Sequence, residues 1–183
     1  MGRIRRFLAT AGTAGLLLTA GALIPATASA AGCPTGWGSA AKTSDIDSAA
    51  TLTGVSAGRY QCFDRVVLKL KGAPDGYDVR YVDGFSTDGE GRTVPARGGA
   101  KLQVIVRSHA YTDAGRATYT PAKPTELFTT SGARTLRQGV WLGSFEGQST
   151  VGVGVRARLP YRVTVVDDPG PGARMVVDVA HTW

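Results

Sequence analysis

Side chains able to do acid–base or metal chemistry are few in this 183-residue chain. It contains 2 His, 2 Cys and no Asn. The two histidines, His109 and His181, lie 72 positions apart and each follows a predicted strand, where a surface or capping role is typical. A zinc hydrolase needs several such ligands at short spacing. We therefore expect no metal site, no cofactor and no catalytic histidine.

Serine and carboxylate chemistry is also poorly supported. The serine-containing segments 84–88 and 143–147 lack the Gly-x-Ser-x-Gly pattern of a nucleophile elbow. A glycan hydrolase would need two carboxylates, such as Asp88 and Glu146, to meet in space. Residues 88–91 instead have the composition of a hairpin turn, and no acidic segment has the spacing of an EF-hand. The sequence predicts no enzyme, with a glycan hydrolase as the weakest alternative.

Aromatic and arginine residues are better candidates, because they suit binding. Aromatic rings offer planar faces to sugars, and guanidinium groups bind carboxylates and phosphates. The candidate ligand-binding residues are Trp37, Arg65, Arg80, Phe145 and Glu146. Trp37, in a glycine-rich segment beside Cys33, is the better candidate for an exposed anchor. The alternative is structural, with Phe145 in the core and Glu146 paired with an arginine.

The N-terminus has the features of a secretory signal peptide over residues 1–30. Arg3, Arg5 and Arg6 precede an apolar stretch at 16–24 and a small-residue cleavage site at 28–30. Threonine, glycine and proline interrupt the apolar run, which argues against a retained membrane anchor and for a mature chain without a transmembrane segment. General secretion is favoured over the twin-arginine route. Lipidation of Cys33, which follows a weak lipobox, is a minor alternative to a secreted or wall-associated protein.

Cys33 and Cys62 both remain after this cleavage. In an oxidising compartment a single disulfide is the expected state, because two thiols without a neighbouring histidine form no recognisable metal site. The bond would tether an N-terminal segment, residues 31–50, to the domain that follows.

The charge of the chain bears on its partners. The net charge of +7 falls to +4 when the three leader arginines are removed. A modest positive charge on an exported protein suits a polyanionic wall, although it also serves solubility. No basic run with interleaved aromatics indicates nucleic-acid binding.

Hydrophobic residues in the mature chain alternate with a period of two. Strands are predicted at Tyr77–Val82, Lys101–Arg107, Gly139–Gly143, Val151–Arg156, Tyr161–Val166, Arg174–Ala180 and 59–70, with a weaker one at 51–55. Glycine-rich turns separate them, and only residues 125–136 are candidates for a helical turn. Seven or eight short strands indicate an all-β fold, an antiparallel two-sheet β-sandwich over residues 51–183 without a substantial helix.

Four ordered motifs, at 62–67, 76–82, 144–150 and 174–181, resemble the AMIN-like domain proteins of high-GC Gram-positive bacteria. The resemblance covers residues 37–181, and the likeness to the broader AMIN envelope-targeting modules is more remote. It implies an exported, non-catalytic role in targeting or wall binding. In the structural alternative, Asp64 and Asp178 of these motifs pair with Arg65 or Arg174.

The leading hypothesis is therefore a secreted module that binds the cell envelope, either peptidoglycan glycan or its anionic polymers. The main alternative is a protein-interaction or inhibitory module for a secreted enzyme, acting through a sheet edge or the long loop at 112–126.

Overall fold

The structure, a computed structural model, describes residues 32–33, 36–46, 49–73 and 76–183. Cys33–Trp183 forms a compact unit. The predicted signal peptide, residues 1–30, lies outside the described residues. The described part of the chain has strands but no helix, as predicted, and so contains no helix long and apolar enough to cross a membrane.

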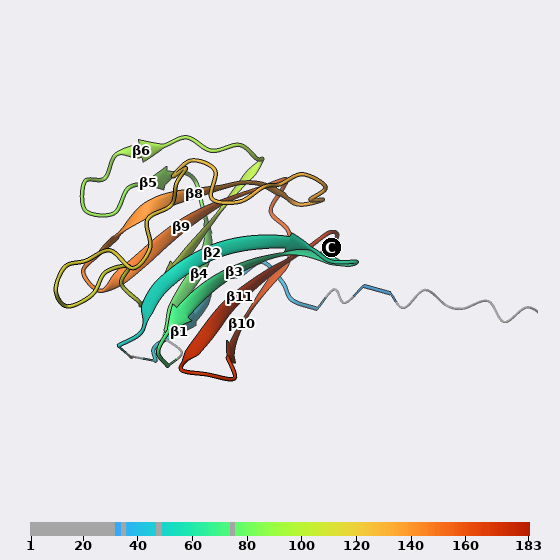
Figure 1. Cartoon of the computed structure of the whole chain (residues 1–183). Helices are drawn as coiled ribbons and strands as arrows, with labels where there is room; N and C mark the ends of the chain where they lie inside the picture. The colour runs from blue at the N-terminus through green and yellow to red at the C-terminus, as the bar shows by residue number, and fades with distance from the viewer. Residues whose placement is uncertain (1–31, 34–35, 47–48, 74–75) are drawn as a thin grey trace, which may run out of the picture. The chain divides into compact units, whose positions relative to one another are not determined.

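Two antiparallel sheets make up the sandwich (Figure 1). The five-stranded sheet has the order β1-β4-β7-β9-β8 and the four-stranded sheet the order β10-β11-β3-β2. The strands are β1 (Lys42–Ser44), β2 (Thr51–Arg59), β3 (Phe63–Lys71), β4 (Tyr77–Val82), β5 (Phe85–Ser86), β6 (Thr93–Val94), β7 (Ala100–Val106), β8 (Leu136–Phe145), β9 (Gln148–Val155), β10 (Tyr161–Asp167) and β11 (Gly172–Ala180).

Period-two alternation decides which side chains enter the core. On β3, Val66, Leu68 and Leu70 are buried while the residues between them face outward. The buried residues of β7, β9 and β11 meet them from the same and the opposite sheet. Tyr77 and Tyr81 pack inward beside Val79, as their spacing predicts.

The β5–β6 hairpin covers the outer side of the five-stranded sheet. Phe85 packs there with Val140 and Leu142 in a second, smaller cluster. Gly152 lies beneath it, because a Cβ at this position would come within 2.8 Å of the Phe85 ring. Glycine in β9 thus permits the hairpin to lie flat on the sheet.

The segment before residue 50 is integrated into the sandwich. β1 pairs with β4, and Tyr161, fully buried, places its hydroxyl 2.8 Å from the Ala40 carbonyl and 2.6 Å from that of Val79. Burial raises the pKa of Tyr161 to about 12, so the phenol remains a donor. The predicted disulfide is confirmed between Cys33 and Cys62.

Three details differ from the sequence-based expectation. The strand expected from residue 59 begins at Phe63, because Tyr60–Cys62 form the turn after β2. Residues 125–136 hold no helical turn and reach β8 through irregular backbone. The 11 strands of the described residues exceed the predicted number because β1, β5 and β6, of two or three residues each, show no alternation.

Candidate functional site

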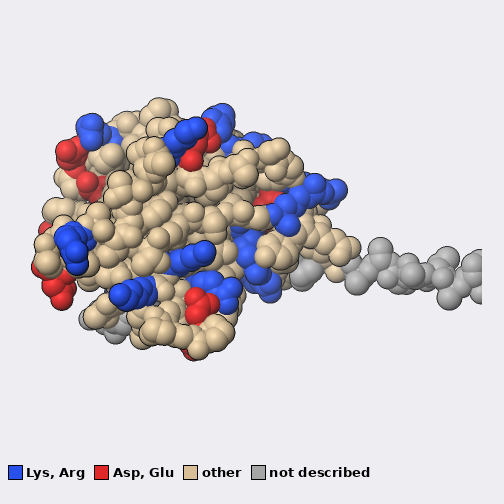
Figure 2. Space-filling model, in the orientation of Figure 1, with Lys and Arg blue, Asp and Glu red and all other residues tan. Residues whose placement is uncertain are grey.

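The outer side of the four-stranded sheet carries an excess of positive charge. Five cationic side chains project from it, and we call this surface the basic face: Arg65, Lys69, Lys71, Arg162 and Arg174. Two carboxylates lie among them in ion pairs, Asp178 and Asp168. Figure 2 shows the lysine and arginine side chains gathered over β3, β11 and β10 with few acidic groups between them.

A row of three charges crosses one end of this face. Asp178 on β11 is in register with Arg65 on β3 and with Arg162 on β10. Arg65 donates to both oxygens of Asp178, at 2.6 and 2.9 Å, and Arg162 donates to one of them at 2.9 Å. The hydrogen bonds from Arg65 to Asp178 raise the pKa of Arg65. The carboxylate is 1% exposed, whereas both guanidinium groups reach solvent.

Three aromatic rings support the two arginines. The Phe63 ring lies between Tyr60, 5.0 Å away and stacked, and Trp37, 5.7 Å away. Arg65 lies 4.6 Å from the Tyr60 ring centre, and Arg162 lies 4.5 Å from that of Trp37. Such contacts hold a guanidinium in place while its outer N–H donors remain available for a ligand. We call Trp37, Tyr60 and Phe63 the aromatic cluster.

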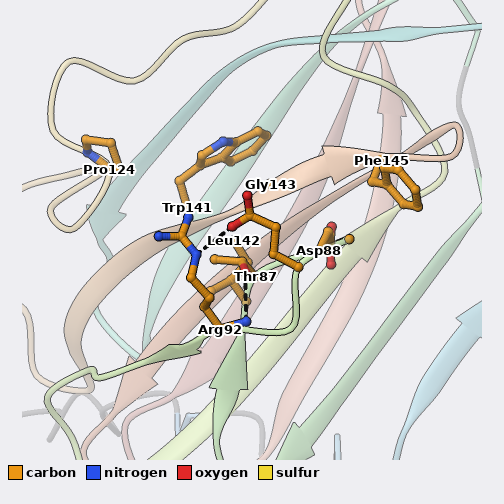
Figure 3. Close-up of a pocket in the computed structure, with 10 residues that line it drawn as sticks. Thr87, Asp88, Arg92, Pro124, Trp141, Leu142, Gly143 and Phe145 are labelled. Carbon is orange, nitrogen blue, oxygen red and sulfur yellow. Dashed lines mark hydrogen bonds and ion pairs between the residues drawn. The ribbon is translucent and has the colours of Figure 1, made fainter.

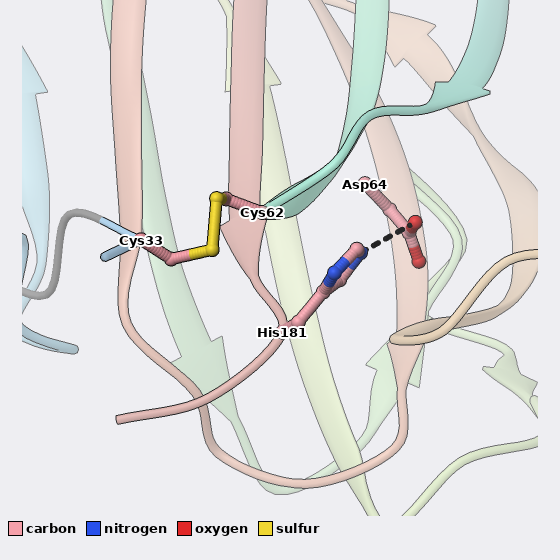
Figure 4. The surroundings of a disulfide bond; sticks show 4 residues. All are labelled: Cys33, Cys62, Asp64 and His181. Carbon is pink, nitrogen blue, oxygen red and sulfur yellow. Dashed lines mark hydrogen bonds and ion pairs between the residues drawn. A yellow bond between two sulfur atoms is a disulfide. The ribbon is translucent and has the colours of Figure 1, made fainter. Parts of the chain in front are cut away.

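Asp64 anchors the strand beneath the aromatic cluster (Figure 4). Its Oδ2 accepts hydrogen bonds from the Thr135 backbone and hydroxyl and from the Leu136 N–H, while Oδ1 lies 3.0 Å from His181 Nε2. Burial acts to raise the pKa of Asp64, but these hydrogen bonds outweigh it and hold the pKa below its ordinary value. The disulfide fixes the adjoining turn, because Cys62 precedes Phe63 directly.

The rest of the basic face is exposed to solvent. Lys69 and Lys71 on β3 are exposed, and Arg174 donates to Asp168 at 2.5 Å. On β2 beside them, Gly54, Ser56 and Gly58 form a column of small residues on this side, and Thr51 lies opposite Lys71. Cations two positions apart on a strand are separated by roughly 7 Å, so the face offers a spaced array of charges to an extended ligand.

The structure brings two of the five predicted ligand-binding residues together. Trp37 and Arg65 both pack on Phe63, although Trp37 is half-buried and not the exposed residue that its glycine-rich context suggested. Arg80 lies on the other sheet and pairs with Asp78.

Phe145 is the last residue of β8 in that sheet, and Glu146 lies in the turn between β8 and β9. Phe145 is 49% exposed, so it is not a core residue, and Glu146 makes no ion pair with an arginine among the described residues. Asp88 lines a cavity with Phe145, and Glu146 lines another with Asp78 and Arg107.

The pairing of the motif carboxylates follows from strand register. Asp178 pairs with Arg65 as expected, but the expectation of an arginine partner for Asp64 is wrong, since Asp64 binds His181. Asp64 points inward on β3, whereas Arg65 points outward. Sequence reasoning also did not identify Arg162, Lys69 and Lys71, although outward positions on strands of strong alternation were a usable signal.

The architecture and its surface define a small, disulfide-bonded antiparallel β-sandwich with one basic sheet face. The family model described as the AMIN-like domain matches residues 50–181, well over half of the chain. The chain therefore belongs to the AMIN-like domain family. Comparisons with curated proteins and with solved structures found no match.

Proposed function

We propose that this protein is an exported, non-catalytic module that binds the anionic polymers of the cell wall through the basic face. The observation that supports this is the charge imbalance there, five cations against two carboxylates that are already paired with them. The disulfide is consistent with export, because such bonds persist in oxidising compartments.

The arrangement suits a phosphate- or carboxylate-bearing chain. Arginine donors match both groups, and the lysines supply point charges without a fixed geometry. The column of small residues on β2 lets an extended polymer approach the cations of β3 closely.

Charge reversal at two exposed lysines tests the proposal. In Lys69→Glu/Lys71→Glu, affinity for purified teichoic acid, measured by calorimetry, should fall about 30-fold or more, since each cation near an anionic surface contributes roughly 1 kcal/mol. The matched control is Arg116→Glu/Lys123→Glu, which changes the net charge equally on an exposed loop. Equal losses of affinity in both variants would show that the interaction depends on net charge alone, and would contradict the basic face as the binding site.

A further inference from the structure

A concave surface lies on the opposite sheet from the basic face, between the β5–β6 turn and the end of β8 (Figure 3). The cavity has a volume of about 560 Å³ and is open to solvent. Its walls include Pro124, Trp141, Leu142 and Phe145, with Asp88 as a polar group. The Trp141 ring packs against the main core and contacts Tyr119 edge-on at 5.3 Å, so Phe145 is the ring that faces the cavity.

A bulge in β8 creates the cavity. The register between β8 and β9 shifts between Trp141 and Gly143, which changes the side of the sheet that the following residues face. Gly143 adopts φ 130°, and a Cβ there would lie 3.3 Å from the Cβ of Asp88. The Asp88 N–H donates to the Leu142 carbonyl at 2.8 Å. The turn is thus fixed directly above the bulge.

Phe145 completes the apolar wall. Its ring lies against Gly89 of the β5–β6 turn and remains 49% exposed. The tight turn that follows it has φ 47° at Glu146 and 82° at Gly147, the backbone of a type I′ hairpin. A large ring held half-exposed by two turns is suited to stacking with a planar or cyclic ligand.

Asp88 has hydrogen-bonding capacity that the protein does not use. Its Oδ2 is buried and has no hydrogen-bond partner. Burial raises the pKa of Asp88, and the nearby Thr150 hydroxyl offsets this only partly. Arg92, the cation of the turn, instead pairs with Glu90 at the rim, at 2.5 Å. Among the described residues no cation pairs with the carboxyl group, and a ligand with hydroxyl or amide donors would provide a partner for Oδ2.

We propose that this cavity binds one pyranose ring of a saccharide, which stacks on Phe145 and donates a hydrogen bond to the Asp88 carboxyl group. Sugar rings combine an apolar face with hydroxyl donors at their edge, which matches the Phe145 ring beside an acceptor without a partner. The inference goes beyond the proposed function, because it concerns the other sheet and an uncharged ligand.

An NMR titration of the disulfide-intact protein tests this inference. The probes are cellobiose and the β-1,4-linked disaccharide of N-acetylglucosamine, both uncharged. Binding of either should shift the amide signals of residues 87–92 and 141–145 and leave those of Arg65 and Phe63 unchanged. A rise in affinity with chain length, from monosaccharide to tetrasaccharide, would identify a polymer as the source of the ring, and equal affinities would identify a free sugar.

Two variants localise the site. Phe145→Ala should weaken binding about tenfold, the effect of losing a stacked ring, and Asp88→Asn should weaken it severalfold without unfolding the protein. The matched control is Tyr60→Ala, which removes a ring of nearly equal exposure, 47%, on the basic face. No shifts at about 10 mM sugar, or equal losses in Phe145→Ala and Tyr60→Ala, would overturn the proposal.

Discussion

The His181 ring lies 3.0 Å from Asp64, a residue 117 positions earlier in the chain, and both side chains are buried. The same carboxylate accepts three further hydrogen bonds from Thr135 and Leu136 at the start of β8. The His181 backbone N–H also donates to the Cys62 carbonyl at 2.9 Å. One carboxylate thereby connects the two sheets next to the disulfide and beneath the aromatic cluster.

Asp64→Asn should lower the free energy of unfolding by about 2–4 kcal/mol at pH 7. The substitution replaces one oxygen of a buried carboxylate, whose two oxygens both have hydrogen-bond partners, by an amide nitrogen that cannot accept a hydrogen bond. Urea unfolding measures the loss, with the exposed Asp113→Asn as the control. The pKa of Asp64 is lowered in the fold, so its contribution is complete above the ordinary aspartate pKa and declines as pH falls through the folded value. The difference in the free energy of unfolding between the wild type and Asp64→Asn should therefore become smaller in acid. A difference that does not change with pH would contradict this role for Asp64.

Removing the disulfide should destabilise the sandwich and loosen its N-terminal segment. The disulfide closes a loop across 29 positions, and Cys33→Ser/Cys62→Ser removes it. The chain-entropy treatment gives a loss of about 3.5 kcal/mol in the free energy of unfolding. Thermal and urea unfolding, with the reduced wild-type protein for comparison, measure the effect. A change below about 1 kcal/mol would mean that β1 and the contacts of Tyr161 hold this segment without the bond.

Asp88→Asn should leave the protein as stable as the wild type or more stable at neutral pH. Burial raises the pKa of Asp88, so the ionised form disfavours the folded state, and the wild type should gain stability as pH falls through the folded value. Urea unfolding at several pH values checks the sign. A loss above about 1 kcal/mol in the variant would show that Asp88 has a structural role and would weaken its assignment as a ligand acceptor.

Arg65→Ala and Arg80→Ala should behave differently, although both arginines were candidates by sequence. Arg65→Ala removes a cation of the basic face, and we expect affinity for the anionic polymer to fall about fivefold. It also leaves Asp178 with Arg162 alone, at a cost of about 1–3 kcal/mol in stability. Arg80→Ala should change neither quantity, because Arg80 is exposed on the other sheet and pairs with Asp78 on its own strand. Binding assays well below the unfolding temperature, with stability measured in parallel, separate the two effects.

Much of the fold could be predicted because its information is local. The alternation along β3, β4 and β11 identified strands and their inward faces from each segment alone. The short strands β5 and β6 could not be predicted in this way, because two residues contain no period and their placement depends on Gly152 beneath Phe85.

The candidate sites depend more on register, which local patterns do not contain. The row Arg65–Asp178–Arg162 exists because β11 pairs with both β3 and β10. The alternation around Arg162 indicates an outward side chain, but nothing near it in the sequence indicates that Asp178 lies beside it. The cavity beside Asp88 depends on a bulge at the far end of β8. Trp37 and Arg65 could be selected by residue type, but their proximity arises from the disulfide and from Phe63 between them.

Co-sedimentation with insoluble cell wall tests the central claim most directly. Wild-type protein, Lys69→Glu/Lys71→Glu and the control Arg116→Glu/Lys123→Glu would be mixed with wall before and after removal of teichoic acids, across a salt series. The account predicts that the wild type and the control bind intact wall, that binding weakens with salt and with removal of the polymer, and that the basic-face variant binds poorly throughout. Undiminished binding of that variant, or no binding of the wild type at low salt, would contradict the account and favour a protein partner.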